Sequence, residues 1–176
     1  MKMKLVDRKG FSLAEAMITV FIFSLMIGGL YSILYVGQES WEANKVKIEL
    51  QQSLRRGMEW MKYDLYQAGQ SSISNVPADG NLYTTITFKI PTGVTGGVIT
   101  WDTNSIQFVL GGTNNEDLQR IYGGVTKVLA SSMSSLQFRR QAASPDILEV
   151  KMAAQKQTVQ DKTINYQLDF QVELRN

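Results

Sequence analysis

The sequence predicts an α+β protein, in which one long N-terminal helix packs against an antiparallel β-sheet head. Three observations predict this fold class. Residues 16–38 carry no charged side chain, residues 54–68 hold an apolar stripe at helical spacing, and polar and apolar residues alternate after residue 80. A helix that is apolar all round in its first half and amphipathic in its second half suits a segment that leaves a membrane and then packs on a sheet.

Composition narrows the range of functions. The 176 residues include no cysteine and no histidine, so disulfides, thiolate metal sites and histidine general bases are excluded. The formal net charge of +2 is concentrated at the start of the chain, in Lys2, Lys4, Arg8 and Lys9, with Asp7 as the one acid there. Because the remainder is close to neutral, bulk charge does not indicate nucleic-acid binding. We expect no enzyme activity and no cofactor.

The uncharged run over residues 16–38 is long enough to cross a bilayer. As a helix, its roughly 23 residues cover about 35 Å, against a hydrocarbon core of about 30 Å. The basic leader predicts an N-terminus in the cytoplasm and the rest of the chain outside. A cleaved secretory signal would need small residues after the apolar run, where the chain reads YSILYVGQESW. A plain anchor does not explain Glu15, since an acid inside a membrane segment is costly.

The helix is predicted to continue beyond the membrane. No proline interrupts residues 39–68, and one apolar face recurs at four-three spacing, in Leu54, Met58, Met61, Leu65 and Ala68. Gly69 is the expected stop. The stripe therefore predicts a contact with the head rather than a ligand site.

The remaining chain is predicted to form strands. Residues 70–81 have loop composition, and strands are expected near residues 85–90, 118–122, 126–140 and 146–154. Residues 97–102 and 105–110 are expected to pair as a hairpin. The final strand alternates most regularly, with its apolar face formed by Ile164, Tyr166, Leu168, Phe170, Val172 and Leu174. Such alternation predicts an antiparallel sheet with one buried face.

The segment KGFSLAEAMITVFIF resembles the class III signal of type IV prepilins and type II secretion pseudopilins, through Gly10, Phe11, Ser12, Leu13 and Glu15. The resemblance implies cleavage between Gly10 and Phe11 by a prepilin peptidase, followed by N-methylation of Phe11. It also implies that Glu15 meets the Phe11 amine of a neighbouring subunit during assembly. An intramembrane acid with a named cationic partner has a physical rationale, because the two charges attract strongly in low dielectric.

The glycine pair inside the span, Gly28 and Gly29, has two interpretations. Small residues let transmembrane helices approach closely, which favours helix packing. Local melting of the helix is the alternative. Major pilins often carry a proline near this point, where this chain has Ser32, so packing is the preferred interpretation.

The stretch RRGMEWMKYDLYQAG resembles the helix end of W-type minor pilins and J-type minor pseudopilins, through Asp64, Leu65, Ala68 and Gly69. The implied organisation is a leader (1–10), a transmembrane half-helix (11–38), an amphipathic half-helix (39–69) and a pilin-fold β-sheet head (70–176). The implied function is a minor pilin or pseudopilin in the tip or initiation complex of a pilus or secretion pseudopilus.

The resemblance also implies a location and partners. The chain would pass once through the inner membrane, with its head in the periplasm. Partners would be other minor subunits, the major subunit, the prepilin peptidase, the inner-membrane assembly platform and the lipid bilayer; DNA is not an expected partner. Two alternatives remain: a tip module that binds DNA or a secreted substrate, and a membrane-anchored periplasmic domain with no filament role.

Other chemistry is weakly indicated. The acidic loops at residues 102–104 and 114–117 do not match an EF-hand, and no metal site is expected. Arg139 and Arg140 are expected on a solvated edge or at a subunit contact, rather than on DNA phosphates. Paired glycines after residue 95 lack the strand-to-helix context of a phosphate loop and are expected in turns.

Overall fold

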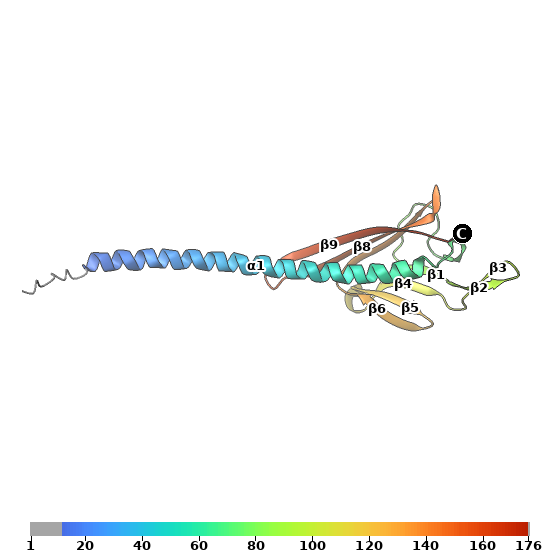
Figure 1. Ribbon diagram of the computed structural model, residues 1–176, viewed down its shortest axis with the longest axis horizontal. Helices are drawn as coiled ribbons and strands as arrows, with labels where there is room; N and C mark the ends of the chain where they lie inside the picture. Colours follow the sequence, from blue (N-terminus) through green and yellow to red (C-terminus); the bar gives the residue numbers. More distant parts are fainter. Residues whose placement is uncertain (1–11, 176) are drawn as a thin grey trace, which may run out of the picture. The chain divides into compact units, whose positions relative to one another are not determined.

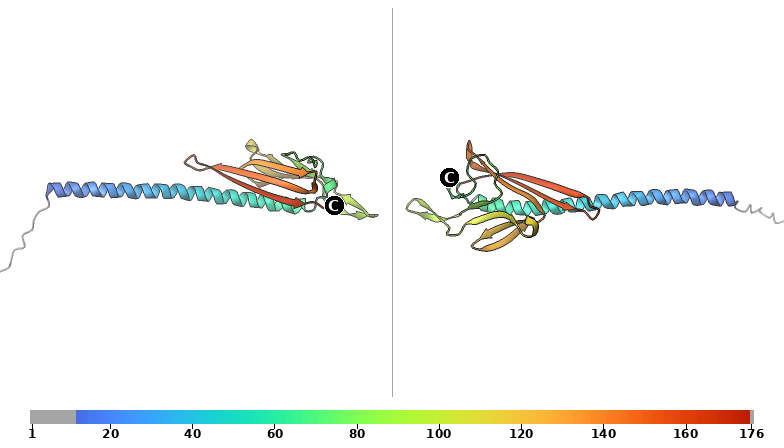
Figure 2. Two further views of the ribbon diagram at one scale, coloured as in Figure 1. Left: turned by 90° about the horizontal axis from the view of Figure 1, so that it is seen from above. Right: turned by 180° about the vertical axis from the view of Figure 1, so that it is seen from behind.

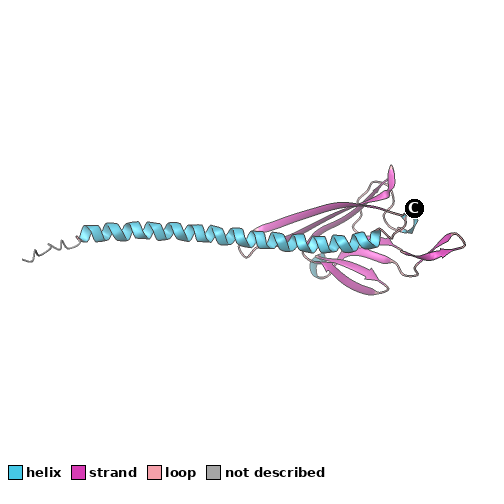
Figure 3. Ribbon diagram, viewed as in Figure 1, coloured by secondary structure: helices cyan, strands magenta, loops and turns pink. Residues whose placement is uncertain are grey.

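The computed structural model describes residues 12–175, in which one long helix precedes nine strands (Figure 3). The helix is α1 (Leu13–Leu65), and two short 3-10 helices, η1 (Gln70–Ser72) and η2 (Thr113–Asn115), interrupt the loops. The strands are β1 (Ile86–Phe88), β2 (Pro91–Thr95), β3 (Val98–Trp101), β4 (Ile106–Gly111), β5 (Asp117–Tyr122), β6 (Val125–Ala130), β7 (Met133–Gln141), β8 (Ser144–Gln157) and β9 (Thr163–Glu173). The α+β fold class predicted from the sequence is confirmed.

The chain divides into two units, Met1–Glu42 and Ala43–Asn176. We call the first the N-terminal unit and the second the head unit. The N-terminal unit contributes the first part of α1. The head unit contains the second part of α1 and every strand.

The head unit holds three antiparallel sheets. A four-stranded sheet has the order β1-β4-β5-β6, a three-stranded sheet has the order β7-β8-β9, and β2 and β3 pair alone. Figures 1 and 2 show the two larger sheets on different sides of the second part of α1, with the β2–β3 hairpin beyond the end of the helix. The second part of α1 therefore packs against two sheets instead of one.

A single hydrophobic core joins helix and sheets inside the head unit. Leu54, Met61, Leu65 and Ala68 of the predicted stripe are fully buried, and Met58 packs partly buried against them. The four-stranded sheet contributes a tilted aromatic pair, Phe88 and Phe108, whose ring centroids are 5.9 Å apart. The three-stranded sheet contributes Leu136, Phe138, Leu148, Val150, Met152, Ala154 and Val172. The helical stripe is thus a core face, as predicted.

The predicted pairing of residues 97–102 with 105–110 is wrong. Strand β3 pairs with β2, while β4 pairs with β1 and β5, so the two segments lie in different sheets. The β2–β3 turn is made by Gly96 and Gly97, with φ of 60° and 80°. Two consecutive residues with positive φ match the twist of a two-residue hairpin, and glycine adopts them without steric cost. The polar segment 102–104 instead leads from one sheet to the next.

The backbone of Arg175 is hydrogen-bonded to the segment that follows α1. The Arg175 amide donates to the Ala68 carbonyl at 3.1 Å, and the Gln70 amide donates to the Arg175 carbonyl at 2.9 Å. Both bonds join Arg175 to the segment that follows α1, which ends at Leu65. The end of the described chain and the segment after the helix are therefore held side by side.

Gly57 allows α1 to approach the four-stranded sheet closely. A Cβ atom at this position would lie 2.8 Å from Cδ2 of Leu118 and 3.3 Å from Cβ of Ala130. Because both neighbours are buried core residues, we expect Gly57→Val to overpack the core and to lower the free energy of unfolding by about 2–3 kcal/mol. Urea unfolding of the full chain in a mild detergent, followed by near-UV circular dichroism, measures the change.

The matched control for this substitution is Gly37→Val. A Cβ at helical Gly37 would meet nothing within 4 Å, so this variant should leave the unfolding of the head unit unchanged. Equal destabilisation by both variants would show that helix propensity, rather than close packing, sets the effect at position 57.

Candidate assembly site

The start of α1 is capped by a reciprocal pair of hydrogen bonds. The Ser12 amide donates to Oε2 of Glu15 at 3.1 Å, and the Glu15 amide donates to Oγ of Ser12 at 3.2 Å. This arrangement is a capping box, in which two side chains satisfy two of the amides that a helix N-terminus leaves unpaired. The Glu15 carboxylate also lies in the first helical turn, where the helix dipole favours negative charge.

The sequence contained the signal for this cap in the spacing Ser-Leu-Ala-Glu from Ser12 to Glu15. The helical role of Ser12 was missed because both residues were assigned to the signal motif. The cap gives Glu15 a structural role within its own chain, in addition to any contact with another subunit. Among the described residues, its Oε1 accepts no hydrogen bond, so this oxygen is available to an outside donor. Gly10 and Phe11, the predicted cleavage and methylation positions, lie outside the described residues.

The N-terminal part of α1 meets the requirements of a membrane span. The helix is long and apolar enough to cross a membrane, and no residue of its most apolar window is buried inside the protein. Three of its hydroxyls are satisfied locally: Thr19, Ser24 and Ser32 donate to the carbonyls of Glu15, Val20 and Gly28, four residues earlier. These local bonds spare three side chains the cost of an unpaired polar group in hydrocarbon.

Gly28 and Gly29 lie inside continuous helix. A Cβ at either position would meet nothing within 4 Å, so the packing of the chain itself does not require glycine there. The absence of side chains leaves two positions at which the backbone of another helix can approach closely.

A buried ion pair connects α1 to the four-stranded sheet. Nε of Arg120, on β5, donates to Oδ2 of Asp64 at 2.6 Å, and Nη2 lies 3.4 Å from Oδ1. The Asp64 side chain is 5% exposed and that of Arg120 is 20% exposed. The Arg120 guanidinium also lies 5.3 Å from the centre of the Tyr122 ring. Asp64, noted in the sequence only for its resemblance to minor subunits, therefore has a structural partner in this chain.

The two consecutive arginines of β7 lie in different environments. Arg139 forms an ion pair with Glu149 on β8. Arg140 is buried and donates to the carbonyls of Pro145 and Val76, and burial lowers the pKa of its guanidinium. The expectation of a solvated edge or subunit contact is therefore wrong for Arg140, because its charge is held by backbone carbonyls of the head unit.

The acidic loop at residues 102–104 is held by hydrogen bonds of Asp102. Asp102 accepts a hydrogen bond from the Tyr122 hydroxyl at 2.6 Å and another from the Asn104 amide at 3.0 Å. The Tyr122 bond, followed by the Asn104 bond, lowers the pKa of the Asp102 carboxyl. Within residues 12–175, no group of three or more acidic, histidine or cysteine side chains could hold a metal ion.

The comparison with protein families finds one feature, at the start of the chain. Residues 6–31 match the prokaryotic N-terminal methylation motif. No curated protein matches the chain. The match and the α+β architecture support the type IV pilin-like class, whose members are structural subunits. The signal and the long apolar helix also indicate membrane anchoring.

Proposed function

We propose that this chain is a minor pilin or minor pseudopilin that joins the tip or initiation complex of an extracytoplasmic filament. The observation that carries the proposal is the methylation motif over residues 6–31, which contains an acid at the capped start of a membrane-length helix. The subunit would wait in the inner membrane with its N-terminus in the cytoplasm and its head in the periplasm. Its role would be assembly, not catalytic turnover.

The proposed assembly contact uses Oε1 of Glu15, which accepts no hydrogen bond from the described residues. After cleavage between Gly10 and Phe11, the new N-terminus would carry a methylated amine, which is a cation at neutral pH. The Glu15 carboxylate of one subunit would pair with the Phe11 amine of the next, while Gly28 and Gly29 allow the helices to approach. Partners would be other minor subunits and the major subunit, with the prepilin peptidase and the assembly platform acting before them.

Processing at Gly10 provides the first test. When the full chain is expressed with a prepilin peptidase, we expect the membrane-bound product to begin at N-methylated Phe11, as read by intact mass and N-terminal sequencing. Gly10→Val should remain uncut, because a branched side chain occupies the position before the scissile bond. Val6→Ala, a substitution in the same leader, should be processed normally.

This test separates the proposal from its main alternative. A membrane-anchored domain with no filament role would keep Met1 even when the peptidase is present. A product cleaved elsewhere, after residue 38 for example, would identify a secretory signal instead. Either outcome would overturn the proposed function.

A further inference from the structure

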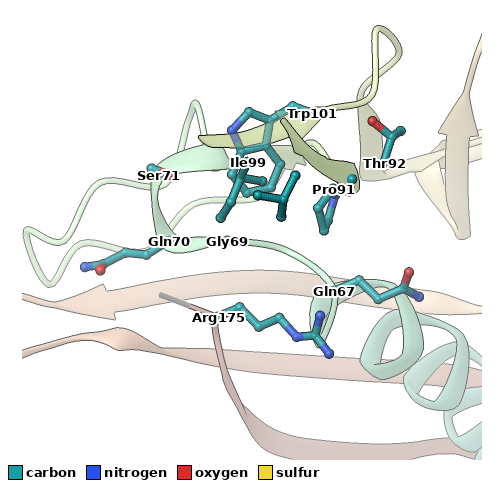
Figure 4. Close-up of a pocket in the computed structure, with 11 residues that line it drawn as sticks. Gln67, Gly69, Gln70, Ser71, Pro91, Thr92, Ile99, Trp101 and Arg175 are labelled. Atoms are coloured by element: carbon teal, nitrogen blue, oxygen red, sulfur yellow. The ribbon is translucent and has the colours of Figure 1, made fainter. Parts of the chain in front are cut away.

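A pocket of about 680 Å³ lies in the head unit beneath the β2–β3 hairpin (Figure 4). Its upper wall comes from the hairpin, and its lower wall comes from the segment after α1 and from the end of the chain. The lining residues are Gln67, Gly69, Gln70, Ser71, Pro91, Thr92, Gly93, Val94, Ile99, Trp101 and Arg175. Pockets of this volume accommodate a small ligand or a short piece of polypeptide.

The hairpin wall is apolar and partly open to solvent. Val94 and Ile99 are register partners across the hairpin, so both lie on one face, and they are 69% and 39% exposed. Trp101, on the same face as Ile99, packs over Gly69, where the ring leaves no room for a Cβ. Exposed apolar side chains grouped around a hollow are typical of a binding surface.

One charged residue lines the pocket. Of the lining residues only Arg175 is charged, and no acid lines the pocket. Among the described residues, the Arg175 guanidinium forms no ion pair or hydrogen bond, whereas Arg120, Arg139 and Arg140 all have partners. The backbone of Arg175 is fixed by its bonds to Ala68 and Gln70. The pocket therefore contains a cationic side chain that has no partner among the described residues and whose backbone is fixed.

The hairpin is anchored where it leaves the four-stranded sheet. The Asp102 amide donates to the Ile90 carbonyl at 2.9 Å, which closes the base of the hairpin. The Tyr122 hydroxyl then ties Asp102 to β5. Beyond this base, β2 and β3 form a two-stranded sheet, so each has an outer edge with no strand partner among the described residues. Such an edge can pair with an added extended chain.

We propose that this pocket binds the carboxyl-terminal end of an extended partner polypeptide whose last side chain is apolar. The terminal carboxylate would pair with the Arg175 guanidinium, and the last side chain would lie against Trp101 and Ile99. The preceding residues would run along the hairpin edge, past Val94. A single unpaired cation matches a single negative charge, and the open apolar wall matches a chain that continues out of the pocket.

The test uses the full chain in lipid nanodiscs and a fluorescein-labelled hexapeptide that ends in Leu-Phe with a free carboxylate. We expect saturable binding by fluorescence anisotropy, and binding about tenfold weaker for the same peptide with an amidated end, since a charge-assisted hydrogen bond is lost. Arg175→Gln should remove the difference between acid and amide. Val94→Asp should weaken binding of the acid by about tenfold or more, because it removes apolar contact and adds a repelling charge.

Matched controls lie elsewhere on the head unit. Arg55→Gln removes an exposed cation of α1, and Val125→Asp adds an acid at an equally exposed valine of β6; neither should change the anisotropy curves. Equal affinity for acid and amide, or no binding at millimolar peptide, would overturn the proposal. The proposal would also be overturned if N-acetyl-phenylalanine bound as tightly as the hexapeptide, since the pocket would then recognise a small molecule rather than an extended chain. A negative result leaves the subunit proposal intact, because processing at Gly10 is measured separately.

Discussion

A chain carrying Glu15→Gln is expected to enter the membrane normally and to be lost from filaments. Glutamine at this position keeps the cap, because its amide oxygen can accept from the Ser12 amide as Oε2 of Glu15 does. The substitution therefore removes the charge without removing the helix start. If the charge of Glu15 pairs with the methylated Phe11 amine of a neighbour, its loss leaves a cation unpaired in low dielectric, which is strongly unfavourable.

The measurement is the amount of the chain in sheared filaments relative to the membrane, by immunoblot. We expect incorporation to fall by about tenfold or more for Glu15→Gln and also for Glu15→Ala. Both variants should still be cleaved before Phe11 and fractionate with the membrane, which separates a defect in assembly from a defect in processing.

Ser12→Ala is the complementary variant. It removes the hydroxyl that accepts from the Glu15 amide at 3.2 Å but keeps the carboxylate. The helix end should lose about 1 kcal/mol, with incorporation close to that of the unsubstituted chain. If Ser12→Ala fails to assemble while Glu15→Gln succeeds, the cap is the essential feature of this segment and the intersubunit ion pair is wrong.

Features with a local pattern could be predicted from the sequence. The stripe from Leu54 to Ala68 repeats at helical spacing, so its burial follows from one segment alone. Strand β9 alternates in the same self-contained way. The methylation motif is likewise a continuous segment of the chain. In each case the residue pattern on which the prediction depends lies within one continuous segment of helix or strand.

Features that depend on distant residues could not be predicted. Strand β2 contains a proline and a glycine and reads as loop, so β3 was assigned the wrong partner. The pocket joins residues from four places in the chain, and its cation comes from Arg175. Arg140 looked exposed because arginine usually is, whereas carbonyls from Val76 and Pro145 surround it. Long-range pairing, rather than local propensity, decides these features.

The ion pair between Asp64 and Arg120 is another such long-range feature, since 56 positions separate the two residues. Arg120→Ala is expected to lower the free energy of unfolding of the head unit by about 3–5 kcal/mol. The reason is that the Asp64 side chain, only 5% exposed, would be left buried without its cationic partner. Urea unfolding of the full chain in a mild detergent measures the loss.

The double variant, Asp64→Ala with Arg120→Ala, should be more stable than Arg120→Ala alone, because it removes the stranded carboxylate. Lys156 and Glu49 provide the matched control: their pair links β8 to α1 at 2.8 Å, but its side chains are 47% and 44% exposed. Lys156→Ala should therefore destabilise the head unit much less than Arg120→Ala does, because exposed ion pairs contribute little. Similar losses for Arg120→Ala and Lys156→Ala would contradict the argument, which attributes the larger loss to the burial of Asp64. The larger loss at Arg120 would instead show that the buried charge pair fastens the helix to the four-stranded sheet.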